Sequence, residues 1–202
     1  SPVTPWLSLS HTRTFCSVDI DTVEEMSGKK IATLDYDAPS IKMVNHVGAA
    51  VVPSNSANFS GKFNNGSVDI AYAPAIAYKP LEMYKGLGEN GAILRYNLAY
   101  LDFQLVFHRE QFSDEYTQKS REFVASLFDR AIKSIKQHTE EIEDHYWLDL
   151  PEAQQKEYNE MLRQVRITLR DEGVYDGKML RLLKNLRCKA DGSAAECVEN
   201  LE

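Results

Sequence analysis

The sequence predicts an α/β fold: a β-α-β-α-β core of parallel strands, followed by a return strand and a helical C-terminal half. Three short apolar segments, at 30–34, 49–52 and 68–72, alternate with two segments of helical spacing. Strands and helices that alternate at this spacing are typical of parallel crossover units. Beyond residue 114 the apolar residues recur at helical spacing instead, which predicts helices there.

The first part of this core has clear start and stop signals. Residues 30–34 form an apolar run typical of a strand, and the polar residues 35–37 indicate a turn after it. Pro39 suits the first turn of a helix, and Gly48 suits its end. The second strand is then expected at 49–52.

The second part of the core repeats this pattern. Residues 54–58 can cap a helix that the pair at 65–66 ends, and a third strand follows at 68–72. Pro74 then opens a third, short helix. Because ligands of open parallel sheets bind beyond the carboxyl ends of the strands, we expect function at the turns after these three strands.

The remaining chain divides by its periodicity. Apolar and polar residues alternate around residues 101–107, which predicts a strand within 92–112. Helices are expected from residue 114, from Pro151 and around 179–186. Four segments result, in chain order: an irregular N-terminal segment at 1–26, the α/β unit at 27–91, the return strand with bracing helices at 92–187, and a tail at 188–202.

Composition excludes some classes of protein. The 202 residues carry a formal net charge of -7, and the sequence pI is about 5.3. Proteins that bind nucleic acid usually present a basic face, so we expect no nucleic-acid partner. No apolar run approaches the roughly 20 residues that a membrane-spanning helix needs.

The three cysteines bear on the compartment. Cys188 and Cys197 flank a short polar loop near the C-terminus, and a disulfide between them would hold that tail. Such a bond favours an oxidising compartment, whereas two separate thiols remain the alternative. Cys16 has no evident partner in the sequence.

Signatures of enzymes are scarce. The sequence has no phosphate-binding loop, no dinucleotide fingerprint and no nucleophile elbow, so we expect neither catalysis nor a cofactor. His138 and His145 flank an acidic run at 140–144, but their spacing suits no standard ligand set, and we expect no metal. Asp35 and Asp37 could form a catalytic pair in a hydrolase, although residues so placed more often cap a helix.

Tyrosines at strand ends are better candidates for binding. Tyr36 and Tyr72 follow or end predicted strands, and a phenol offers flat contact area together with one hydroxyl. The alternative is that they cover the edge of the core. Nearby acidic groups favour a cationic or hydroxyl-rich ligand. The expected ligand site has six members: Asp35, Tyr36, Asp37, Ser54, Asn58 and Tyr72.

The order of these motifs resembles a known family. The motifs are Gly28-Lys29-Lys30-Ile31, Gly48-Ala49, Asn65-Gly66-Ser67-Val68-Asp69 and Pro74. Together they resemble the second lobe of substrate-binding proteins of tripartite ATP-independent periplasmic transporters. The resemblance implies a lobe of the periplasmic-binding-protein type, with the first lobe largely missing.

A bacterial group of solute-binding proteins is similar over a longer stretch, from about Ser27 to Cys197. The shared segments are residues 28–37, 63–66, 79–88, 172–176 and 188–197. Some members carry a label as resistance-nodulation-division-type efflux components linked to aminoglycoside resistance. The resemblance implies a periplasmic protein that captures a small polar solute between two lobes for a membrane transporter subunit. An accessory role in drug efflux through protein contacts is the alternative, and self-association would follow from an uncovered face.

Two positions depart from the transporter family. That family places an arginine, which clamps a ligand carboxylate, where this sequence has Ala32. Its polar pair before the strand-end proline is replaced by Tyr72 and Ala73. The fold can therefore be shared while the specificity differs.

Overall fold

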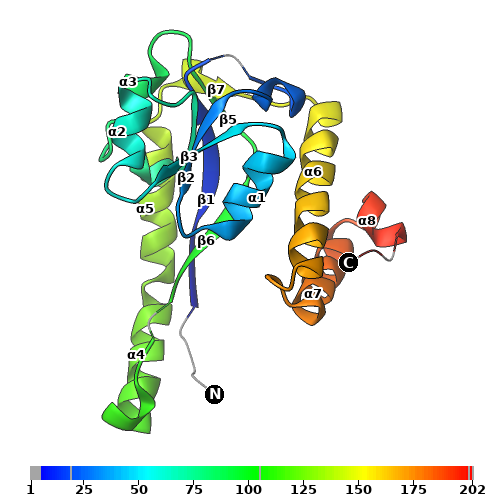
Figure 1. The fold of residues 1–202 in the computed structure, drawn as a ribbon. Coiled ribbons are helices and arrows are strands. Elements are labelled where there is room, and N and C mark those ends of the chain that lie inside the picture. The colour runs from blue at the N-terminus through cyan, green and yellow to red at the C-terminus, as the bar shows by residue number, and fades with distance from the viewer. Residues whose placement is uncertain (1–5, 19, 105, 200, 202) are drawn as a thin grey trace. The chain divides into compact units, whose positions relative to one another are not determined.

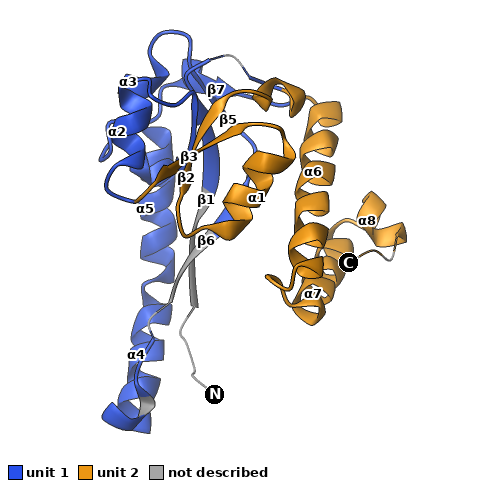
Figure 2. Ribbon diagram, viewed as in Figure 1, with its two compact units in different colours: residues 1–21, 56–150 blue, residues 22–55, 151–202 orange. Residues whose placement is uncertain are grey.

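The computed structural model describes residues 6–18, 20–104, 106–199 and 201. The chain forms two compact units, and each is built from two separate stretches of sequence (Figure 2). Unit 1 comprises residues 1–21 and 56–150, and unit 2 comprises residues 22–55 and 151–202.

The sheet of unit 1 is organised around one long strand, β1 (Trp6–Cys16). Three strands pair with β1 antiparallel: β4 (Ile70–Pro74), β5 (Ala92–Leu94) and β6 (Ala99–Gln104). The short strand β7 (Trp147–Leu148) pairs parallel with β5. Antiparallel pairing on both edges makes β1 the structural centre of this unit (Figure 1).

The core of unit 1 lies where three of these strands meet. Phe15 of β1 is opposite Ala71 of β4 and Ile93 of β5, and all three side chains have no exposed area. The prediction of an irregular segment at 1–26 is therefore wrong over β1. Its alternation is weak, and what stabilises it is hydrogen bonding to strands that come much later in the chain.

The helices of unit 1 surround this sheet. They are α2 (Phe59–Asn64), η2 (Ala75–Ala77), α3 (Tyr84–Leu87), η3 (Arg109–Gln111), α4 (Asp114–Ser126), α5 (Phe128–Glu140) and η4 (Asp144–Tyr146). The helix expected from residue 114 begins as predicted, where the Ser113 hydroxyl accepts a hydrogen bond from the Tyr116 amide at 3.2 Å. It is interrupted at Leu127, so the predicted stripe runs over two helices.

The predicted return strand is also divided. β5 and β6 occupy parts of the range 92–112, with residues 95–98 between them. Leu105, which the alternation included, lies outside the described residues, and residues 106–108 are not part of a strand.

Unit 2 combines a parallel strand pair with the C-terminal helices. Its elements are η1 (Glu24–Met26), β2 (Lys30–Leu34), α1 (Ala38–His46), β3 (Ala50–Ser54), α6 (Glu152–Asp171), α7 (Gly177–Ala190) and α8 (Ala195–Val198). β2 and β3 are parallel, with Leu34 opposite Ser54. This β-α-β unit confirms the prediction for residues 30–54.

Helix α1 packs against α6 within unit 2. The buried face of α6 includes Tyr158, Met161, Val165 and Leu169, which recur at helical spacing. The predicted α/β unit at 27–91 does not coincide with one compact unit, because the chain passes from unit 2 to unit 1 between residues 55 and 56.

The predicted disulfide is present in the tail of unit 2. Cys188 and Cys197 are bonded, and their Cα atoms lie 5.6 Å apart. Cys16 of β1 is buried and is not part of this disulfide.

Candidate functional site

The predicted acidic turn follows β2 and begins α1. Asp37 is the N-cap of α1: its Oδ1 accepts a hydrogen bond from the Ser40 amide at 3.3 Å, and its Oδ2 accepts one from the Ser40 hydroxyl. The Asp35 amide donates to the Ser54 carbonyl oxygen at 2.9 Å. Tyr36, by contrast, is 71% exposed. Asp37 therefore has a structural role as a cap, whereas the Tyr36 side chain is open to solvent.

The structure brings together four of the six predicted site residues. Asp35, Tyr36 and Asp37 lie beside Ser54 at the carboxyl ends of β2 and β3. The buried Ser54 hydroxyl donates to the Val52 carbonyl oxygen at 3.0 Å.

The other two predicted residues belong to unit 1. Asn58 is exposed at the N-cap position of α2. Tyr72 is a partly buried residue of β4, opposite Thr14 of β1.

A second candidate site lies on the sheet of unit 1, where two arginines contact one indole. Arg13 of β1 precedes Phe15 by two residues, and Arg95 directly follows β5, two residues after Ile93, which is opposite Phe15. The Arg13 guanidinium carbon lies 5.7 Å from the centroid of the Trp147 ring, and that of Arg95 lies 4.6 Å from it. Guanidinium groups at these distances gain cation–π attraction from the indole.

The charges at this site are unbalanced. Arg95 Nε lies 3.0 Å from Asp149 Oδ1, in an exposed pair. No carboxylate in the described part of the chain forms an ion pair with Arg13. Burial lowers the pKa of Arg13, and the neighbouring charge of Arg95 lowers it further. Two like charges this close to one ring repel each other, so a bound anion would relieve this repulsion.

Sequence reasoning missed this second site. Arg13 lies in a segment that was predicted to be irregular, and Arg95 belongs to no recognised motif. Their proximity depends on the pairing of β1 with β5, which no local pattern encodes. We find no signal in the sequence alone that could have joined them.

Three further tyrosines form a structural cluster in unit 1. The buried Tyr78 hydroxyl donates a hydrogen bond to Glu143, and Lys79 Nζ lies 5.4 Å from the centroid of the Tyr78 ring and 5.6 Å from that of Tyr84. Burial raises the pKa of Tyr78, and the hydrogen bond to Glu143 and its charge raise it further. The Tyr146 hydroxyl also donates to the Gly88 carbonyl oxygen at 2.9 Å. These contacts join the segment after β4 to η4, which is a structural role.

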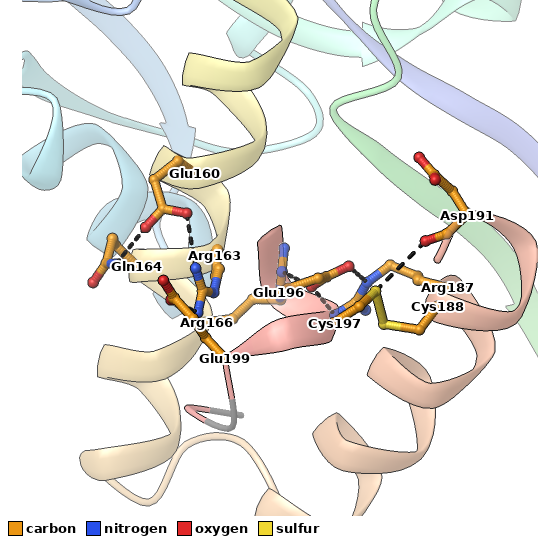
Figure 3. Close-up of polar contacts among 10 residues, drawn as sticks. All are labelled: Glu160, Arg163, Gln164, Arg166, Arg187, Cys188, Asp191, Glu196, Cys197 and Glu199. Carbon is orange, nitrogen blue, oxygen red and sulfur yellow. Dashed lines mark hydrogen bonds and ion pairs between the residues drawn. A yellow bond between two sulfur atoms is a disulfide. The ribbon is translucent and has the colours of Figure 1, made fainter. Parts of the chain in front are cut away.

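A polar cluster in unit 2 holds the C-terminal tail (Figure 3). Only 5% of the Arg163 side chain is exposed, and this arginine pairs with Glu160 at 3.1 Å and with Glu199 at 2.6 Å. Glu196 accepts hydrogen bonds from Arg187 and Arg166. The bonds from Arg187 are the main cause that lowers the pKa of Glu196. Here each buried charge has a partner, as a structural network requires.

Two other structural features, a metal site and a membrane-spanning helix, are absent from the described residues. No group of three His, Cys, Asp or Glu side chains in them is arranged to hold a metal ion. No helix in the same residues combines the length and the apolar character needed to cross a bilayer.

Comparison with curated proteins finds similar chains in Acinetobacter baumannii. One, named "Probable solute-binding protein AdeT1", is 42% identical over 183 residues, which cover 91% of this chain. The match spans 60% of the length of that relative.

Solved structures share the fold at low sequence identity. A tripartite-transporter periplasmic solute-binding protein from Desulfovibrio salexigens, with bound orotic acid, has a TM-score of 0.67 and 13% identity. The match covers 90% of this chain and 59% of that one. A protein of the same class from Pseudomonas aeruginosa, with bound L-malate, has a TM-score of 0.66 and 9% identity, with 79% and 58% covered. The fold is therefore that of these periplasmic solute-binding proteins, over a little more than half of their length.

The sequence family is settled by a broader match. A family model described as "Solute-binding protein AdeT 1/2" matches residues 15–202, which include β1 from Phe15 onward, all later elements and the disulfide. The chain therefore belongs to the AdeT 1/2 family of solute-binding proteins.

Proposed function

We propose that the protein binds a small solute that carries a carboxylate group, in the periplasm, and delivers it to a membrane transporter subunit. The class of function follows from the family and the fold. The carboxylate is proposed from the sheet of unit 1, where Arg13 and Arg95 both contact the ring of Trp147.

The observation that carries this proposal is the charge balance at Arg13. A partly buried guanidinium without an ion-pair partner in the described residues is costly, and a second cation beside it increases the cost. Arginine binds carboxylates through two parallel hydrogen bonds, and an adjacent indole gives flat apolar contact to an organic ligand. A carboxylate on a small organic molecule therefore matches the group that this site lacks.

The neighbours in the fold support the same ligand class. Orotic acid and L-malate, which are bound in two of them, are both organic acids. The acidic turn after β2 favours a cationic or hydroxyl-rich ligand instead, but Asp37 of that turn already caps a helix. Because Ala32 stands where the transporter family has its arginine, Arg13 and Arg95 are proposed to supply the positive charge in this chain.

The six residues predicted from the sequence are proposed as further ligand contacts, in addition to the two arginines. Tyr36 is exposed at the end of a strand, where a phenol ring can pack on a ligand. In unit 1, Tyr72 is proposed to contribute its ring from β4, and Asn58 a polar group. In unit 2, Asp35, Asp37 and Ser54 are proposed to contact hydroxyl or cationic groups of a ligand rather than its carboxylate. Loss of affinity in Tyr36→Ala or Tyr72→Ala would support these contacts.

The family and the structural neighbours are solute-binding proteins rather than enzymes, and we propose no catalysis by Asp35 and Asp37. Periplasmic residence is proposed from the compartment of the neighbours and from the disulfide. No observation on this chain favours the alternative of an accessory protein in drug efflux.

Ligand-dependent thermal stabilisation tests the proposal. The chain is melted with L-malate, orotate, a polyamine, a neutral sugar and an aminoglycoside, each over a concentration series. The organic acids are expected to raise the melting temperature, because a ligand that binds only the folded state stabilises it. In Arg13→Gln this shift should disappear.

The matched control is Arg130→Gln, which removes one exposed arginine from α5 in the same unit. It should keep the shift with organic acids. The proposed ligand class is wrong if only the polyamine or the aminoglycoside stabilises the chain, or if Arg13→Gln and Arg130→Gln respond alike.

A further inference from the structure

Helix α7 presents an apolar stripe to solvent. Met179, Leu182, Leu183 and Leu186 recur at the spacing of one helix face, and each is between 42% and 52% exposed. The sequence predicted a helix here, and Leu180 and Lys184 are its buried residues. The stripe is therefore available for contact with another surface.

The charges on α7 have one sign. The helix carries five lysines and arginines and no acidic residue, in a chain whose formal net charge is -7. Three of these cations, Lys178, Arg181 and Lys189, are exposed. At 3.6 residues per turn they lie along one flank of the stripe, on the side of Leu182.

The opposite flank of α7 is occupied within the protein. Arg187 is bound to Glu196 of α8, and the disulfide from Cys188 fixes α8 beside the C-terminal turn of α7 (Figure 3). The tail thus neutralises the one cation on that side and leaves the stripe and its basic flank open.

A second copy of α7 is a poor partner for this surface. Two such helices could bury their leucines against each other, but neither offers an acidic residue to the cations of the other. In an antiparallel pair the two basic flanks would lie side by side and repel each other, and in a parallel pair α7 of the partner would offer no carboxylate to them. The leucine stripe and its basic flank therefore fit a partner that is both apolar and negatively charged.

We propose that the exposed face of α7 docks on the surface of an anionic lipid bilayer. An interfacial helix lies in the plane of the membrane with its leucines in the acyl boundary and its lysines and arginines at the headgroup phosphates. A single row of flexible side chains on a convex helix fits a fluid surface, which needs no matching groove. The contact would hold the protein beside the membrane, and it does not depend on the ligand proposed for unit 1.

Sedimentation with lipid vesicles tests this proposal on the chain as it is. Vesicles of phosphatidylcholine with phosphatidylglycerol should bind the protein, vesicles of phosphatidylcholine alone should not, and added salt should weaken the binding. The double variant Lys178→Glu with Lys189→Glu should lower the vesicle partition coefficient about tenfold or more. Leu182→Ser with Leu186→Ser should weaken binding without a change in net charge.

The control is Lys133→Glu with Lys136→Glu, which makes the same change in charge at exposed positions of α5. It should bind anionic vesicles as the parent does. Equal losses in the two lysine variants would overturn the proposal, because the attraction would then depend on overall charge. Absence of binding to anionic vesicles would overturn it too, as would a dimer in solution that Leu182→Ser with Leu186→Ser abolishes, since a second copy would then cover the stripe.

Discussion

Arg187 donates two hydrogen bonds to the Glu196 carboxylate, from Nε to Oε1 at 2.7 Å and from Nη2 to Oε2 at 2.8 Å, across the loop that the disulfide closes (Figure 3). Arg166 of α6 approaches Glu196 Oε2 at 3.2 Å. One carboxylate thus joins the tail to both long helices of unit 2. The tail is therefore held by the disulfide and by the ion pairs of Glu196, and each of these can be removed separately by mutation.

Removal of the disulfide should destabilise unit 2. In Cys188→Ser with Cys197→Ser, the free energy of unfolding should fall by about 2–3 kcal/mol, because closing a loop of this length restricts the unfolded chain. Urea denaturation measures the change. A reductant should lower the stability of the parent to that of the variant and leave the variant unchanged. Equal stability of parent and variant would show that the bond contributes nothing.

Glu196 should make stability depend on acidity. Its folded-state pKa lies below the ordinary value of 4.5, so its stabilising effect is complete above that value and is lost as pH falls through the folded pKa. Glu196→Gln should therefore cost about 1–2 kcal/mol near neutral pH and progressively less as the pH falls below the ordinary pKa of a glutamate. Urea denaturation over a pH series checks this. A difference that stays constant down to acid pH would mean that the ionised carboxylate is not the cause.

Gly86 of α3 packs closely against Phe63 of α2, so a larger residue at position 86 should destabilise the protein. A Cβ at Gly86 would clash with the ring of the fully buried Phe63 and would lie 2.8 Å from the Phe63 carbonyl oxygen. Gly86→Ala should destabilise the protein by about 2 kcal/mol or more in thermal or urea unfolding. Gly61→Ala is the matched control, since a Cβ there meets nothing within 4 Å and alanine favours helix α2. The packing argument would be contradicted by similar effects at the two positions.

The elements that the sequence predicted correctly are those whose signals are local. β2 is a short apolar run between a glycine turn and a polar turn, and α1 has a proline at its start and a glycine after its end. The pairing of Cys188 with Cys197 depends only on a short loop. Such features are encoded within a few residues, so sequence reasoning finds them.

What the sequence did not predict depends on distant partners. β1 is stabilised by strands from three later parts of the chain, and the arginine pair exists only because β1 and β5 are antiparallel neighbours. Helical spacing predicted α7 but not which of its faces is buried, because that depends on the packing of the unit. For the acidic turn, the capping role of Asp37 was one of the two interpretations that the sequence allowed.

Replacement of Arg13 should separate the roles of binding and stability. If the charge of Arg13 serves to bind an anionic ligand, the repulsion between Arg13 and Arg95 destabilises the protein when no ligand is bound. Arg13→Met keeps the apolar stem beside Trp147 and removes the charge. The free energy of unfolding without ligand should then rise by about 0.5–1 kcal/mol, whereas the stabilisation by organic acids should be lost.

Arg95→Met is the control for this effect, because Arg95 already pairs with Asp149. Arg95→Met relieves the same repulsion but leaves the exposed Asp149 carboxylate without this partner. The free energy of unfolding should therefore rise less than in Arg13→Met. Urea denaturation without ligand, in low and high salt, distinguishes the two variants, since salt screens the repulsion and should reduce the gain from Arg13→Met. A loss of stability in Arg13→Met at low salt would mean that the Arg13 charge is satisfied within the folded chain, and the case for an anionic ligand would then fail.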